Sequence, residues 1–171
     1  WYTAKHTYAY YTDTLGTHAA ADTLFFEALE AADAEGVDLT IFDNDGDTQA
    51  EGVVLQTSRT IRAQARFRAS ATLQGIYFRP FAIQPVSNGT DFRLGTTCHE
   101  YGHILGLPDL YLTDEPIGLY DIMSHAKGNP PGHFSAWSKV RLGWIDPIDI
   151  YDATLGMELP NSVENPFAVR I

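Results

Sequence analysis

Residues 99–109 read HEYGHILGLPD, and this stretch decides how the rest of the chain is interpreted. His99 and His103 are four positions apart, so in an α-helix their imidazoles project from one face on consecutive turns. Gly106 can take the left-handed conformation that ends a helix, and Pro108 prevents the helix from resuming. Asp109 can then turn back toward the imidazoles. The stretch therefore predicts three polar side chains brought together at the end of a helix.

These three side chains are a plausible ligand set for a metal ion. Neutral imidazole is a preferred zinc ligand, and catalytic zinc sites commonly use three protein ligands and leave the fourth position to water. Glu100 points about a third of a turn away from His99, which suits a general base that contacts the activated water. The alternative is a set of solvated surface residues. Because the surrounding helix is apolar, and burying these groups without partners costs several kcal/mol, we favour metal coordination.

Length and composition limit the remaining choices. The chain has 171 residues, 44% of them hydrophobic, which suits one compact domain. A formal net charge of -11 disfavours nucleic acid and anionic membrane surfaces as partners. No apolar run approaches the roughly 20 residues that span a bilayer, so we expect no membrane insertion. The single cysteine, Cys98, excludes an intrachain disulfide and is interpreted as a small buried hydrophobe.

Hydrophobic periodicity and turn residues predict an α/β (α+β) domain with a twisted mixed sheet and the motif helix beneath it. A catalytic domain is expected over 1–147, followed by a strand-like segment, 148–171, that would begin a further domain. Pro80 places the last predicted strand at an edge or a bulge. The predicted strands are 5–12, 39–42, 52–57, 61–69 and 76–83, and the predicted helices are 21–36, from near Asp91–Thr96 to Gly106, and 133–143.

Three longer stretches resemble a known family. HEYGHILGLPDLY (99–111), GLYDIMS (118–124) and FSAWSKVRLGWI (134–145) are similar to the catalytic domain of the immune inhibitor A family of secreted bacterial metallopeptidases. These are zincins with a methionine turn, so the resemblance implies a metzincin-like domain with an active-site helix and a C-terminal helix. An acidic segment, FDNDGDTQAEGVVLQ (42–56), is also similar to that family. The resemblance implies a secreted protein.

The resemblance also implies roles for individual residues. His99, His103 and Asp109 would bind zinc, Glu100 would be catalytic, and Met123 would form the turn beneath the metal. Two positions depart from the family pattern. Cys98 stands where the family usually has a small apolar residue, and Leu112 where an acidic residue often follows, with Asp114 as a substitute for that carboxylate.

A second cation site is suggested by DNDGD (43–47). Asp43, Asp45 and Asp47 alternate along the chain as oxygen ligands do in calcium loops. It is not an EF-hand, because Thr48 stands where that loop requires glycine and Val54 where it requires glutamate. The alternative is a solvated turn, since Asn, Asp and Gly are good turn formers. Both interpretations stay open.

The other histidines carry weaker hypotheses. His125 lies two residues beyond Met123 and could hydrogen-bond the substrate or the oxyanion, while an exposed loop histidine is the alternative. His6, His18 and His133 have no companion ligands at useful spacing and are interpreted as structural.

The residues together predict a zinc-dependent endopeptidase, acting as a monomer on protein or peptide substrates, with Glu100 as the general base. An extended substrate would pair with strand 61–69. Its Arg62, Arg66 and Arg68 could favour acidic peptides, although protective charges on an exposed edge are the preferred interpretation. Two alternatives are a zinc-stabilised binding or adhesion module without turnover and a metal-dependent amidase acting on non-peptide substrates.

Overall fold

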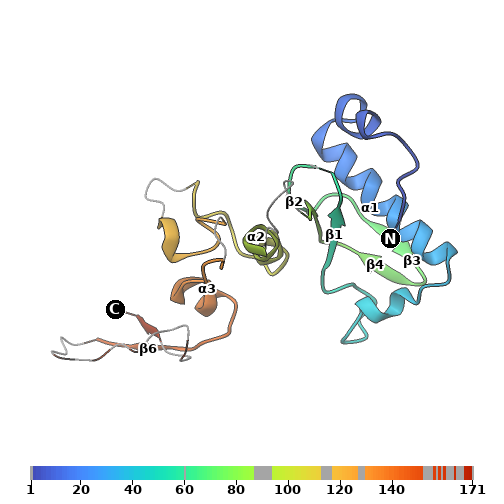
Figure 1. Ribbon diagram of the computed structural model, residues 1–171. Helices are drawn as coiled ribbons and strands as arrows, with labels where there is room; N and C mark the ends of the chain where they lie inside the picture. Colours follow the sequence, from blue (N-terminus) through green and yellow to red (C-terminus); the bar gives the residue numbers. More distant parts are fainter. Residues whose placement is uncertain are drawn as a thin grey trace.

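The structure is a computed structural model that describes residues 2–59, 61–86, 94–112, 117–126, 130–151 and 168–170, with positions 156, 158, 160 and 164. It is a mixed α/β fold built around a small sheet. Helix α1 (Gly16–Ala34) lies on one side of this sheet and helix α2 (Leu94–Ile104) on the other, as Figure 1 shows. The predicted α/β class with a mixed sheet is confirmed.

The sheet has three strands in the order β1-β5-β2. Strand β1 (Val53–Thr57) runs parallel to β5 (Phe81–Pro85), and β2 (Gln64–Arg66) runs antiparallel to it. All five residues of β5 are buried, because the strand has a neighbour on each side and a helix on each face. Strand β2 is therefore an edge strand, and it faces the helix that carries the HEYGH motif.

The main core joins α1 to the sheet. Phe25 of α1 stacks on Phe81 of β5, with ring centroids 3.7 Å apart and an interplanar angle of 2°. Leu29, Leu39 and Phe78 complete the centre of this cluster. Burying side chains of this size contributes about 1.5–3 kcal/mol each, so the cluster fixes α1 against the sheet.

A hairpin precedes β5. Strands β3 (Ala71–Leu73) and β4 (Ile76–Phe78) are antiparallel and are joined by Gln74 and Gly75, which both have positive φ, as a two-residue hairpin turn requires. The predicted single strand 76–83 is thus two strands. They are separated at Arg79 and Pro80, and this peptide bond is cis. Pro80 lies outside both strands, which leaves β5 free to pair on both sides.

Two predicted strands are wrong. In place of a strand over 5–12, the chain turns helical at Tyr8 and forms a π-helix over Tyr10–Thr14. Tyr11 is buried there and its hydroxyl donates to Glu27 of α1, so tertiary packing overrides the β propensity of Tyr and Thr. In place of a strand over 39–42, a 3₁₀ helix forms over Leu39–Phe42, because the Asp38 side chain accepts from the Thr40 N–H and caps it.

The remaining elements agree with the patterns in kind and differ in length. Strand β2 covers only three residues of the predicted 61–69, and α3 (Ala136–Arg141) begins after the Ser135 cap. A short 3₁₀ helix spans Gly118–Tyr120. Strands β6 (Pro147–Asp149) and β7 (Ala168–Arg170) pair in parallel, and β6 spans the predicted boundary between 1–147 and 148–171. None of the described helices is long and apolar enough to cross a bilayer.

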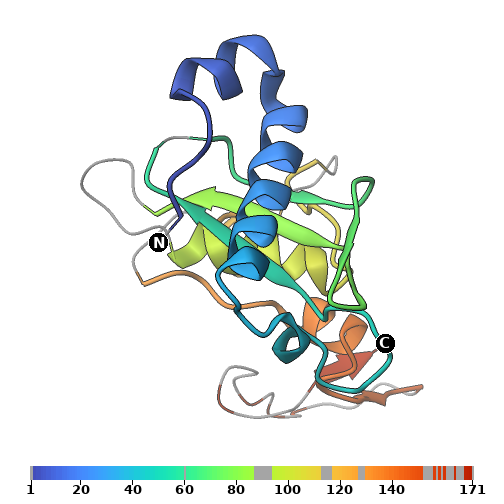
Figure 2. The same cartoon turned by 90° about the vertical axis from the view of Figure 1, so that its right-hand side faces the viewer.

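Figure 2 shows how the helices are layered on the two faces of the sheet. The blue helix α1 crosses in front of the sheet, α2 lies behind it, and the orange and red segment with α3 and β6 lies below. The central position of α2 means that one of its faces meets the sheet and another meets the C-terminal half of the chain. The HEYGH motif therefore lies between the two parts.

Candidate metal centre

Helix α2 ends with a hydrogen-bonding pattern typical of a glycine C-cap. The Leu107 N–H donates to the Gly102 carbonyl at 2.9 Å and the Gly106 N–H donates to the His103 carbonyl at 2.9 Å, which are the two bonds of a Schellman motif. Gly106 has a φ of +97°, a conformation that residues with a Cβ rarely adopt. The chain reverses there and carries Asp109 back toward the helix, as the sequence predicts.

The structure brings His99, His103 and Asp109 together. The Nε2 atoms of His99 and His103 lie 3.2 Å and 3.1 Å from Oδ1 of Asp109. The ligand atoms of all three residues lie within 4.8 Å of one another. His99 is buried and the other two are half-buried. One cation placed among these atoms would be in reach of all three.

The hydrogen bonds behind the imidazoles show which nitrogen faces the cluster. His99 Nδ1 lies 3.0 Å from the Ile122 carbonyl, and His103 Nδ1 lies 2.8 Å from the Leu107 carbonyl. Because a carbonyl only accepts, each Nδ1 must carry the proton, and a neutral imidazole then presents the Nε2 lone pair to the cluster. Backbone carbonyls behind ligating histidines are a common device for orienting metal ligands.

This arrangement fits a cation. Two Nε2 lone pairs and a carboxylate oxygen converge, and Oδ1 of Asp109 is buried with no hydrogen-bond donor among the described residues. Three acceptors this close repel one another, and charging both imidazoles in a buried site costs desolvation free energy. A divalent ion with nitrogen and oxygen ligands satisfies all three atoms at once. This donor set, with one position left for water, is the one that zinc takes in catalytic sites.

Glu100 lies beside this cluster, 7% exposed, and contacts the edge strand. Burial raises the pKa of its carboxyl, while His99, His103 and a hydrogen bond donated by the Ala65 N–H act in the opposite direction. The bond from Ala65 holds the carboxylate between β2 and α2. Glu100 is therefore positioned beside the metal cluster and is oriented by the strand rather than by the cluster itself.

Met123 and Asp121 belong to the loop of residues 121–124, the methionine loop, which packs against α2. Met123 is fully buried with Leu107 and Ile122, and its carbonyl accepts from the Leu110 N–H, next to Asp109. Asp121 is also fully buried, and its carboxylate accepts hydrogen bonds from the Met123 N–H, the Ser135 N–H and the Ser138 hydroxyl. Asp121 thus ties the methionine loop to the start of α3 and is engaged away from the His99–His103–Asp109 cluster.

A cavity of about 490 Å³ opens at the cluster, bounded by α2 on one side and by the edge strand β2 on the other. Tyr111 lines it, with its ring 5.9 Å from that of His99 and nearly parallel to it. Burial raises the pKa of the Tyr111 hydroxyl, and the neighbouring Asp109 carboxylate acts in the same direction. The cavity places the cluster, Glu100 and a strand edge in one open space, which an extended chain can enter.

The other candidate residues near the motif are placed as follows. His125 is half-buried, with its backbone N–H bonded to the Asp121 carbonyl, and it is neither in the cluster nor in the cavity wall. Cys98 packs against the Met123 cluster, and burial raises the pKa of its thiol, in agreement with a hydrophobic role. Asp114 lies outside the described residues.

The acidic loop forms a different cluster from the one predicted. Asp43 and Asp45 lie within reach of one cation, but the third carboxylate is that of Glu51. Asp47 is not in this set, and its carboxylate accepts from the backbone and side-chain amides of Gln49. The loop's carboxylates also accept from its own backbone, since Asp43 bonds the N–H groups of Gly46 and Thr48 and Glu51 bonds those of Asn44 and Asp45.

The cavity is also lined by residues that the sequence patterns do not indicate as part of the site. His18, interpreted as structural, lines the cavity from α1, and Gln64 and Tyr111 line it from β2 and from the segment after Asp109. No local pattern marks His18 or Gln64, because each reaches the cavity only through the packing of α1 on the sheet. The spacing of calcium loops predicts Asp47 as the third carboxylate ligand, whereas Glu51 lies outside that spacing and joins Asp43 and Asp45 only through the fold of the loop.

The geometry and the comparisons with known proteins lead to one class. A His-His-Asp cluster beside a buried carboxyl group, at the wall of an open cavity, is the arrangement of a metal-dependent hydrolase. Residues 59–144 match the family model described as immune inhibitor A peptidase M6, catalytic domain. This match spans half of the chain, and the chain belongs to the immune inhibitor A peptidase M6 family. The resemblance noted in the motifs is confirmed.

Curated relatives agree with this assignment. The chain is 40% identical over 70 residues to pre-pro-metalloprotease PrtV of Vibrio cholerae serotype O1 (strain M66-2), covering 34% of this chain and 7% of that protein. It is 34% identical over 95 residues to immune inhibitor A of Bacillus thuringiensis subsp. alesti, covering 49% of this chain and 12% of that protein. The chain thus spans a small part of the length of these relatives. No solved structure matches.

Proposed function

We propose that the chain is the catalytic part of a zinc-dependent endopeptidase. The observation that carries this proposal is the convergence of two Nε2 lone pairs and a buried, undonated carboxylate oxygen beside Glu100. His99, His103 and Asp109 would hold the zinc. When bound, zinc would polarise the peptide carbonyl and make a water molecule more acidic. The family match and the metalloprotease name of the Vibrio relative support this chemistry.

Glu100 supplies the proton transfers. Its carboxylate takes a proton from the attacking water and passes it to the leaving amine, so the reaction needs no covalent intermediate. Burial raises the pKa of Glu100, which favours a base that holds the proton long enough to deliver it, and a bound cation would moderate this shift. The Ala65 N–H keeps the carboxylate facing the cavity. Met123 packs beneath α2 and keeps the third ligand close to the first two.

The substrate binds in an extended conformation along the edge of β2. This strand pairs with β5 on one side only, and its other edge borders the cavity. A peptide can add to such an edge by backbone hydrogen bonds, which places its carbonyls near the cluster without requiring a particular side chain. Proteins and peptides are therefore the proposed substrates. The protein itself is proposed to be a secreted monomer with a metzincin-like zincin fold.

Calcium is the second proposed ion. Asp43, Asp45 and Glu51 would supply the oxygen ligands, in place of the predicted set that included Asp47. The ion would compensate the repulsion of three neighbouring carboxylates and stabilise the loop between the 3₁₀ helix over Leu39–Phe42 and β1. This proposal concerns stability and leaves the zinc chemistry unchanged.

The proposed peptidase activity is tested by incubating the purified chain with unfolded casein and with small non-peptide amides, each with and without a chelator. Cleavage of casein that is lost with the chelator and restored by zinc is the expected result. Hydrolysis of the small amides alone would favour an amidase. Zinc bound at one equivalent with no hydrolysis of either substrate would favour a binding module.

A further inference from the structure

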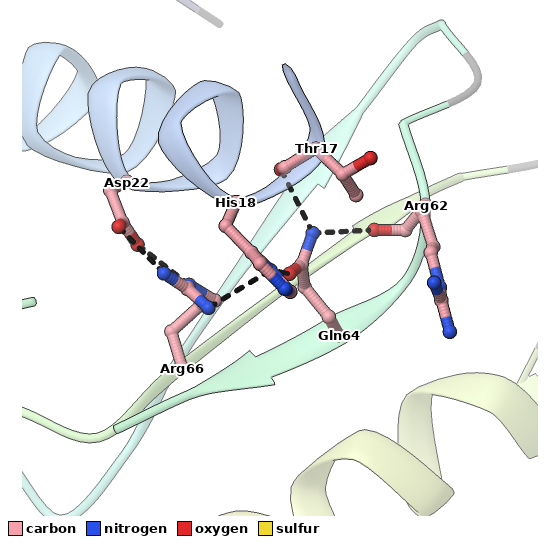
Figure 3. Close-up of polar contacts among 6 residues, drawn as sticks. All are labelled: Thr17, His18, Asp22, Arg62, Gln64 and Arg66. Atoms are coloured by element: carbon pink, nitrogen blue, oxygen red, sulfur yellow. Dashed lines mark hydrogen bonds and ion pairs between the residues drawn. The ribbon is translucent and has the colours of Figure 1, made fainter. Parts of the chain in front are cut away.

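The three arginines predicted along the edge strand have different environments. Arg66 is neutralised, because its Nε and Nη2 donate to the two carboxylate oxygens of Asp22 at 2.7 Å each, as Figure 3 shows. Arg68 is exposed and does not line the cavity. Arg62 is exposed and does line it. Only Arg62 therefore combines a position in the cavity with a guanidinium that has no carboxylate within 4.0 Å among the described residues.

The backbone under Arg62 is held in place by Gln64. The Gln64 side chain is buried, and its Nε2 donates to the carbonyls of Arg62 and Thr17. These two bonds tie the segment just before β2 to α1, because Thr17 belongs to α1. In Figure 3 the Arg62 side chain extends away from Asp22 and Arg66, on the side where α2 is drawn. The backbone at Arg62 is thus held in place, and its side chain points away from the ion pair between Arg66 and Asp22.

His18 of α1 lines the same cavity as Arg62. Gln64 Oε1 can only accept, and it lies 2.7 Å from His18 Nδ1, so Nδ1 carries a proton. The same Nδ1 also lies 3.1 Å from Nη1 of Arg66. His18 and the Arg62 guanidinium both line the cavity, in a chain with a net charge of -11.

Arg62 and Tyr111 both line the cavity, Arg62 from the segment just before β2 and Tyr111 from the segment after Asp109. A second, smaller cavity of about 90 Å³ on the α1 side shares Arg62 with Tyr11, Thr17 and Ile61.

We propose that Arg62 is a specificity-determining residue that selects peptide substrates carrying an aspartate or glutamate side chain close to the cleaved bond. This inference rests on the proposed peptidase function. A guanidinium can bind a carboxylate through two parallel hydrogen bonds, which gives both attraction and a preferred orientation. A peptide lying along β2 would place one of its side chains near Arg62, which lies just before this strand, and an acidic side chain would pair with the only guanidinium that lines the cavity among the described residues.

The test is cleavage-site profiling of the zinc-loaded protein on a random peptide library, with Arg62→Gln, Arg62→Glu and the control Arg68→Gln. We expect the wild type and Arg68→Gln to share an enrichment of Asp and Glu at one subsite. Arg62→Gln should lose it, and Arg62→Glu should replace it with Lys and Arg. For one acidic peptide, KM should rise by about five-fold in Arg62→Gln with kcat retained, whereas a Gln-substituted peptide should be unaffected.

The outcomes separate this inference from the function on which it rests. Cleavage by the wild type without acidic enrichment, or an enrichment that persists in Arg62→Gln, overturns the role of Arg62 and leaves the peptidase intact. A fall in kcat that is equal for the acidic and the Gln-substituted peptide would show a structural role and also overturns it. No cleavage of any peptide by zinc-loaded wild type overturns the peptidase function and the inference together.

Discussion

Gly102 and Met123 are in contact beneath the metal cluster: a Cβ added to Gly102 would lie 2.5 Å from the sulfur of Met123. It would also lie 3.1 Å from the ring of Phe134. Because Met123 is fully buried, its sulfur has little room to move. The absence of a side chain at Gly102 therefore allows the methionine loop to pack directly against α2, one residue before His103.

Replacing Gly102 with alanine should destabilise the protein despite the helix propensity of alanine. Overpacking costs about 1–3 kcal/mol, against a gain of up to about 1 kcal/mol from removing a helical glycine. We expect Tm to fall by a few degrees and zinc affinity to weaken. Gly132→Ala is the control, since its Cβ would meet only the Leu119 carbonyl at 3.5 Å. An unchanged Tm for Gly102→Ala would mean that Met123 can shift at little cost.

Replacing Glu100 with glutamine should leave zinc bound and remove activity. The amide keeps the shape of the side chain but cannot accept the proton, and general bases contribute about 10²–10⁴-fold to the rate. Zinc content and casein hydrolysis are measured together, with the exposed Glu35→Gln as the control. If Glu100→Gln kept more than a few per cent of the wild-type rate, the base would have to be another group.

Replacing Asp109 with alanine should greatly reduce zinc affinity, because two histidines on one helix would remain as the protein ligands. The measurement is zinc stoichiometry after dialysis, with the exposed Asp146→Ala as the control. Asp109→His should still bind zinc, since the number of ligands is kept. Full zinc content and near-normal activity in Asp109→Ala would show that Asp109 only ends the helix segment and that the third ligand lies elsewhere.

Calcium binding by the acidic loop, residues 43–47, can be tested by replacing its carboxylates in separate variants. In the wild type, Tm should be higher in calcium than in a calcium-selective chelator, and the paired change of Asp43 and Asp45 to Asn should abolish this difference. Asp47→Asn is the matched control and should keep it, because Asp47 bonds Gln49 instead of joining the cluster. Zinc content should stay the same in all variants. Equal wild-type melting in both conditions would make the loop a solvated turn.

Stability at alkaline pH should depend on Tyr11. Burial and the bond to Glu27 raise the pKa of Tyr11 from 10.0 to about 12 in the folded state. Between these values the unfolded chain has lost the phenolic proton and the folded chain keeps it, so stability falls as pH rises from about 10 to about 12. Tyr11→Phe should remove this contribution to the fall, while costing up to about 1.5–3 kcal/mol at neutral pH by removing the shorter of the two hydroxyl donors to Glu27, the other being that of Tyr2 at 3.4 Å.

Urea unfolding at pH 7, 9 and 11 measures both effects. Tyr120→Phe is the control, because Tyr120 is 85% exposed and should leave the pH dependence unchanged. If Tyr11→Phe lost stability between pH 9 and 11 as steeply as the wild type does, other groups would dominate the alkaline transition.

Local sequence patterns are enough to predict the features of this protein that depend on neighbouring residues. The spacing of His99 and His103, the glycine at 106 and the proline at 108 act within one helix and its cap, so the helix, its end and the return of Asp109 could be predicted. The helix over 21–36 and the strand over 52–57 were predictable for the same reason, since periodicity and turn residues are local signals.

The remaining features could not be predicted in this way, because they depend on which distant segments pack together. Residues 5–12 have a strand-like composition, but Tyr11 is buried against Glu27 and the chain is helical over Tyr10–Thr14. Strand β5 becomes central because β1 and β2 both pair with it, which no pattern within 76–83 reveals. In the same way, the packing of α1 on the sheet brings His18 to the cavity and neutralises Arg66 with Asp22, and so leaves Arg62 as the cavity's free guanidinium among the described residues.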